Sequence, residues 1–101
     1  MTSGPSKPPK PQPYTAAEAR RFLRVCTKAG AVAYIQHVKG RMAQRKVTMA
    51  EIVSVLRAGV VEEAEPVGGH WRHVVWSPQV EVVVQFRSET DVVVVTAWRR
   101  R

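Results

Sequence analysis

A single change of hydrophobic period, at Val60, divides this sequence into two kinds of structure. Before it, apolar residues recur at helical spacing, and Met49, Ile52, Val53 and Leu56 follow the i, i+3, i+4, i+7 pattern of a helix face packed on a core. After it, valine-rich segments alternate with a period of two, which is typical of strands. The sequence therefore predicts an α+β fold, with two or three N-terminal helices packed on one face of a three- to four-stranded, mainly antiparallel sheet.

Two capping boxes mark where helices begin. Thr15 is followed by Glu18 and Thr48 by Glu51, each at the spacing that lets hydroxyl and carboxylate satisfy the first amides of a helix. Gly30 and Gly59 supply the matching ends. Residues 31–36 fit either a short strand or the first turn of a helix, and we expect a helix that starts at about Val32 or Ala33.

The second half predicts an edge strand over Val60–Glu65, a turn at residues 66–69, and strands over residues 70–77, 80–87 and 92–99. The valine runs 82–84 and 92–95 are too apolar for a sheet with one wet face, so we expect the middle of the sheet to be covered. Trp71 and Trp76 fall on opposite faces of one strand, which predicts one core tryptophan and one partly exposed.

Residues 1–13 hold five of the seven prolines and predict a disordered arm, followed by one domain over residues 14–101. The net charge is +8, and eight basic residues with no acidic one lie between Arg20 and Lys46. Such a field attracts polyanions. No apolar run approaches the roughly 20 residues of a membrane span, and we expect no membrane partner, no cofactor, no metal site and a cytoplasmic location. The single Cys26 excludes a disulfide framework.

The candidate site begins with His37, Arg41 and Arg45, which are spaced by four residues. On a helix each such step turns about 40°, so the three side chains form one row beside the apolar stripe of Val38 and Met42. A row of cationic groups at the core boundary predicts a site for an anion. The alternative is a boundary histidine beside ordinary surface arginines.

The run His37-x-x-x-Arg41-Met42-x-x-Arg45-x-Val47-Thr48, continuing to Val61, resembles domain-of-unknown-function family 4258, as does the closing Val94-Val95-Thr96. The resemblance covers about Ala31 to Trp98. It implies membership of the fold group of barnase, EndoU, colicin and RelE ribonucleases, many of which are toxins with a cognate antitoxin or immunity protein. It implies an RNA-cleaving, often metal-independent site on the sheet. The net charge of +8 predicts that a protein partner which blocks such a site is acidic. Such a domain acts in the cytoplasm, in some cases after delivery into a target cell as part of a larger toxin.

Metal-free RNA cleavage needs a base for the 2′-hydroxyl, an acid for the departing 5′-oxygen and cations for the phosphorane. Histidine titrates near neutral pH and arginine binds two phosphate oxygens at once. We therefore assign catalytic roles to His37, Arg41, Arg45 and Thr96. Substrate-binding roles are assigned to four further residues: Arg87, Trp98, Lys39 and Lys46. The second proton-transfer group stays open among Arg87, Glu81, His70 and His73.

Two other functions remain open. The same basic face would suit a non-catalytic module that binds nucleic acid or the ribosome. It would also suit a plain interaction domain for an acidic partner. Only the ribonuclease needs His37 itself.

Overall fold

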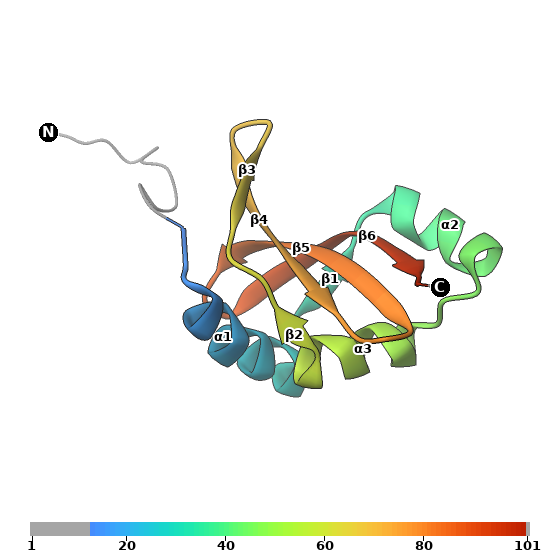
Figure 1. Cartoon of the computed structure of the whole chain (residues 1–101), viewed down its shortest axis with the longest axis horizontal. Coiled ribbons are helices and arrows are strands. Elements are labelled where there is room, and N and C mark those ends of the chain that lie inside the picture. Colours follow the sequence, from blue (N-terminus) through green and yellow to red (C-terminus); the bar gives the residue numbers. More distant parts are fainter. Residues whose placement is uncertain (1–12, 101) are drawn as a thin grey trace, which may run out of the picture.

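The computed structural model describes residues 13–100, which form three helices and six strands in an α+β arrangement (Figure 1). In chain order the elements are α1 (Ala16–Ala29), β1 (Val32–Tyr34), α2 (Gln36–Arg45), α3 (Met49–Ala58), β2 (Val60–Val61), β3 (Glu65–Val67), β4 (His70–Trp76), β5 (Val80–Ser88) and β6 (Asp91–Arg99). The predicted fold class is confirmed. The predicted arm, residues 1–13, lies outside the described part of the chain except for Pro13. None of the described helices is long and apolar enough to cross a membrane.

Both predicted capping boxes are present. The Glu18 amide donates to the Thr15 hydroxyl at 3.1 Å, and the Thr15 amide donates to the Glu18 carboxylate at 2.9 Å. Thr48 and Glu51 repeat the arrangement at the start of α3. Gly30 ends α1 in the left-handed region, at φ 73°, where a residue without a Cβ is favoured.

The sheet has more strands than predicted, in the order β1-β6-β5-β4-β2, with β3 also paired to β4. All pairs are antiparallel except β1 with β6, which joins Val32 to Val92 and Tyr34 to Val94. The expected helix start at Val32 or Ala33 is therefore wrong: α2 begins only at Gln36. The expected strand at Val60–Glu65 is split into β2 and β3, and Pro66 lies inside β3 rather than in a turn.

The helices α1 and α3 cover one face of the sheet, and α2 lies at its β6 edge (Figure 1). The core lies between them. Its largest fully buried apolar side chains come from α1, α3 and three strands of the sheet: Leu23, Cys26, Ile52, Leu56, Val75, Val80, Val82, Val84, Val92 and Val94. At one end, the rings of Tyr14, Phe22 and Phe86 pack edge to face.

The other face of the sheet is not covered as we expected. Val83, Val93 and Val95 lie on it and are half-buried, so the helices within residues 13–100 cover one face only. Neither tryptophan of β4 joins the core. Trp76 pairs with Glu81 on the open face, and Trp71 lies in the β3–β4 hairpin with 37% of its surface exposed.

Val75 shares the inward side of β4 with His73, which is 1% exposed and packs on Phe86. Its Nδ1 bonds the Glu62 carbonyl at 2.9 Å, which assigns the proton to that nitrogen. His73 is thus a packing residue on the helix side of the sheet.

Candidate functional site

The helix α2 is positioned by the end of β1 and by two apolar side chains. The Ile35 amide donates to the Val94 carbonyl at 3.4 Å, so the chain leaves the β1–β6 pairing directly before the helix starts. Val38 is buried, and Met42 packs against the core. This fixes the rotation of α2 and places the predicted row on its neighbouring stripe, with His37 and Arg41 exposed and Arg45 half-buried.

Arg45 binds the edge of β6. Its Nη1 donates to the Thr96 hydroxyl at 3.2 Å and to the Ala97 carbonyl at 3.0 Å. In the described part of the chain, β1 pairs with β6 only as far as Val94. Arg45 therefore satisfies a carbonyl that no strand reaches on that side. Both acceptors are neutral, so neither compensates the positive charge of the guanidinium at the sheet edge.

A shallow pocket of about 450 Å³ opens at this junction. It is lined by four side chains, from α2 and from the end of β6: Arg45, Thr96, Trp98 and Arg99. The sequence-predicted residues Arg45, Thr96 and Trp98 are thus brought together. Their catalytic and binding roles stay predictions.

Arg99 was not among the predicted site residues, and it is held differently from Arg45. It donates to the Lys46 carbonyl, and its Nη2 lies 2.7 Å from a Glu51 carboxylate oxygen. Hydrogen bonding from Arg99 lowers the pKa of the Glu51 carboxyl. Arg99 therefore tethers β6 to the start of α3, and its charge is largely matched there. Adjacent residues of a strand point to opposite faces of the sheet, so the sequence alone predicts that Arg99 and Trp98 lie on different faces.

The open face of the sheet continues from this pocket. Trp98 lies directly opposite Glu81, and Thr96 lies opposite Val83. A register shift between Val83 and Val84 marks a bulge in the β5–β6 ladder, which aims Thr96 towards the open face beside α2. The Arg100 guanidinium lies 4.6 Å from the centre of the Trp76 ring and 3.8 Å from the Glu81 carboxylate, so its charge is paired. The neighbouring pocket is also lined by Glu62, Glu63 and Glu65, so the surface around Trp76 is aromatic and mainly acidic.

Several predicted residues lie elsewhere. Arg87 binds Asp91 through two hydrogen bonds of 3.1 and 3.0 Å at the β5–β6 turn, at the opposite end of β6 from Trp98. Lys39 is exposed roughly 200° around α2 from His37, and Lys46 ends the helix in the left-handed region at φ 56°. These three do not join the Arg45 pocket.

The candidates for a second proton-transfer group separate as well. His73 is in the core, and His70 lies in the β3–β4 hairpin with its Nδ1 3.4 Å from the Gln85 amide. Of the four, Glu81 lies on the open face next to Trp98 and is a diagonal neighbour of Thr96, roughly 7–8 Å away.

Over residues 13–100, no three His, Cys, Asp or Glu side chains gather closely enough to hold a metal ion. Cys26 is buried, and burial raises the pKa of its thiol, with Asp91 adding to the effect. Cys26 is therefore protonated at neutral pH and unsuited to act as a nucleophile.

Residues 34–99 match the family described as "Domain of unknown function (DUF4258)". The chain belongs to this family. The DUF4258 match spans α2, α3 and the strands from β2 to β6, and so it includes every member of the His37 row and of the Arg45 pocket. It leaves out α1. No curated protein and no solved structure matches the chain.

Proposed function

We propose that this DUF4258 chain is a toxin-type ribonuclease that cleaves RNA without a metal ion where α2 meets β6. The observation that supports this most strongly is the placement of Arg45. In the described part of the chain its guanidinium donates to two neutral acceptors, the Thr96 hydroxyl and the Ala97 carbonyl, and it lies beside an aromatic side chain, Trp98. Such a group binds a phosphate without first having to be ordered.

The remaining members of the row extend this site along α2. Arg41 and His37 lie one and two turns before Arg45, at Cα separations of roughly 6 and 12 Å. An RNA strand that follows the row would meet three groups in succession. Arg45 would hold one phosphate, Arg41 the phosphate that is attacked, and His37 the adjacent 2′-hydroxyl. Trp98 would stack on a base at the sheet end of the strand.

The reaction proposed for these groups is transfer of the phosphate to the neighbouring 2′-oxygen. The neutral His37 imidazole takes the 2′-hydroxyl proton, and the 2′-oxygen bonds to phosphorus. The bond from phosphorus to the 5′-oxygen breaks, and that oxygen takes a proton from water. Arg41 stabilises the charge that develops on the phosphorane. The products are a 2′,3′-cyclic phosphate and a 5′-hydroxyl.

The test uses the full chain with a labelled single-stranded RNA and a DNA of the same sequence, in the presence of a chelator. We expect the RNA to be cut to fragments with 2′,3′-cyclic phosphate ends and the DNA to stay intact, because DNA lacks the attacking hydroxyl. RNA that remains intact at protein concentrations that bind it would refute the ribonuclease proposal. Cleavage that requires an added divalent ion would refute its metal independence.

A non-catalytic nucleic-acid-binding module is the second candidate, and one observation favours it. His37 is exposed, and within residues 13–100 it forms no hydrogen bond or ion pair with an acidic or histidine side chain. Binding needs only the charges of Arg41, Arg45 and the neighbouring cations. Under either proposal the partner protein is an acidic antitoxin or immunity protein, and the site of action is the cytoplasm.

A further inference from the structure

Part of the outer surface of α3 is apolar, although a helix packed on one side only is expected to be polar there. Its inner side buries Ile52, Val55 and Leu56. Its outer side carries Met49, which is 46% exposed, and a half-buried Val53. We expected both of these in the core. Instead α3 has a second apolar stripe that faces away from it.

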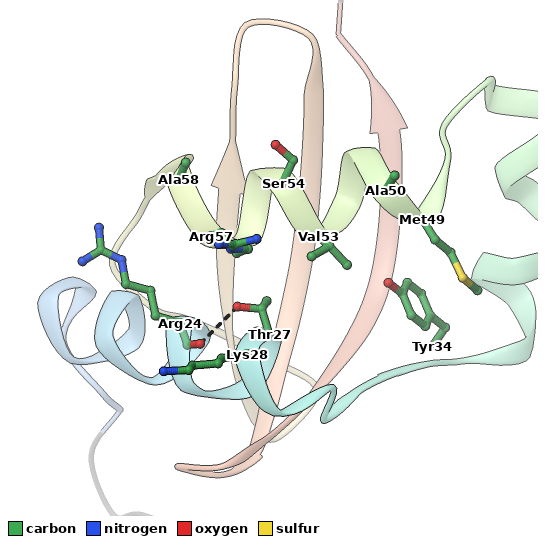
Figure 2. A pocket seen from close by; sticks show the side chains of 10 residues that line it. All are labelled: Arg24, Thr27, Lys28, Tyr34, Met49, Ala50, Val53, Ser54, Arg57 and Ala58. Carbon is green, nitrogen blue, oxygen red and sulfur yellow. Dashed lines mark hydrogen bonds between the residues drawn. The ribbon is translucent and has the colours of Figure 1, made fainter.

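This stripe forms one wall of a groove of about 1140 Å³ between α1 and α3 (Figure 2). The α3 wall alternates larger and small residues, and Ala50, Ser54 and Ala58 recur at four-residue spacing. The side chain of Tyr34, from β1, lies in the groove near Met49. Burial raises the pKa of Tyr34, so its phenol is neutral at physiological pH.

The charge in the groove is of one sign and lies at one end. Arg24, Lys28 and Arg57 gather there, away from Tyr34 and Met49 (Figure 2). All three are exposed, and none of the ten lining residues is acidic. The Thr27 hydroxyl is already bonded to the Leu23 carbonyl at 2.9 Å, so it offers no donor to a ligand.

We infer that this groove binds an acidic amphipathic α-helix of a protein partner. Small residues on α3 let a second helix approach closely, and the apolar end accepts its hydrophobic side chains. The cationic end matches acidic residues at one end of the bound helix. RNA fits less well, because the apolar end of the groove offers one aromatic ring, that of Tyr34, for base stacking and few groups that could hydrogen-bond base edges.

The groove is distinct from the candidate ribonuclease site. Tyr34 pairs with the inward residue Val94 and so faces the helix layer, whereas Thr96 and Trp98 lie on the open face of the sheet. A helix bound in the groove leaves the Arg45 pocket uncovered. The inference is therefore independent of the proposed RNA cleavage, and it stands if the chain proves not to be an enzyme.

The probe is a synthetic helical peptide of about 14 residues, long enough to span the ten residues of α3. It carries leucines on one stripe and glutamates at one end, and a control peptide replaces those glutamates with lysine. Each is titrated into the isotope-labelled full chain, followed by amide chemical shifts. We expect the acidic peptide to shift Tyr34, Val53 and Ser54 while Thr96 stays unchanged, and its affinity to fall as salt is raised.

Two matched pairs of variants locate the binding. Met49→Glu places a charge on the apolar wall, and Val25→Glu makes the same change at a position of similar exposure, 46% against 44%, outside the groove. We expect the first to weaken the acidic peptide by at least about tenfold and the second by less than about twofold. Arg57→Glu should weaken it more than Arg21→Glu, which lies on α1 outside the groove lining.

Any of three results would overturn the inference. One is the absence of binding at millimolar peptide, and another is equal binding of the lysine peptide. The third is that single-stranded RNA, rather than the peptide, shifts Val53 and Ser54. Melting curves of Met49→Glu and Val25→Glu establish that both variants are folded before affinities are compared.

Discussion

Replacing Arg45 with alanine tests how firmly the end of β6 depends on α2. The change removes two hydrogen bonds from a cationic donor, at 3.2 and 3.0 Å. Such bonds contribute about 1.5–3 kcal/mol each when buried. Arg45 is only half-buried, so in the alanine variant water can hydrogen-bond to the two acceptors and recover part of this energy. The expected loss of unfolding free energy for the pair is therefore about 1.5–2 kcal/mol. For a domain of this size that lowers the melting temperature by about 6–15 °C.

The assay is urea and thermal denaturation of the full chain, with Arg41→Ala as the matched control. Arg41 is on the same stripe and exposed, so its replacement should change stability by less than about 0.5 kcal/mol. Thr96→Val removes one of the two acceptors, and a double-mutant cycle with Arg45→Ala should give a coupling of about 0.5–1 kcal/mol. Equal melting temperatures for the two alanine variants, or zero coupling, would refute this view of the sheet edge.

Three further predictions concern other parts of the chain. Arg99 lowers the pKa of Glu51 in the folded state below its usual 4.5, so their contact stabilises the fold above about pH 5 and loses that effect as falling pH protonates the glutamate. Glu51→Gln should therefore reduce the loss of melting temperature on acidification. An unchanged plot of melting temperature against pH would contradict this. Gly59→Ala should destabilise by about 1–3 kcal/mol, since its Cβ would lie 2.6 Å from the Trp76 carbonyl oxygen. Gly40→Ala, with nothing within 4 Å, should stabilise by roughly 0.5–1 kcal/mol, and urea denaturation that ranks the two the other way would refute both. Removing residues 1–13 should shift the melting temperature by less than about 2 °C, whereas Tyr14→Ala should lower it clearly, because that ring packs 4.8 Å from Phe22; equal melting temperatures would show that this contact is dispensable.

Sequence reasoning predicted the elements whose signals are local. The capping boxes at Thr15 and Thr48 and the change of period at Val60 act within a few residues, and the structure has helices and strands where they indicated. The strand β1 was missed because its three residues become a strand only by pairing with β6, far along the chain. Its own periodicity is too short to decide between helix and strand.

The candidate site was predicted in part for the same reason. Helical spacing places Arg45 on the row, and strand alternation allows Thr96 and Trp98 to share a face, so their meeting follows from two local rules and one packing contact. The partners of individual charges do not follow from such rules. Arg87 forms an ion pair with Asp91 across a turn, and Arg99 forms one with Glu51 of another element. The groove between α1 and α3 depends on how the two helices pack against each other, and the sequence of neither helix determines that packing by itself.

The account depends most directly on His37. The deciding measurement is the rate of RNA cleavage per folded molecule for His37→Ala beside the wild-type chain, in the presence of a chelator, with RNA affinity and melting temperature measured on the same samples. Because His37 is exposed, folding should be unchanged within about 0.5 kcal/mol. We expect RNA affinity to be retained and cleavage to fall by at least about a hundredfold. Cleavage per folded molecule equal to that of the wild-type chain would show that His37 is not the base.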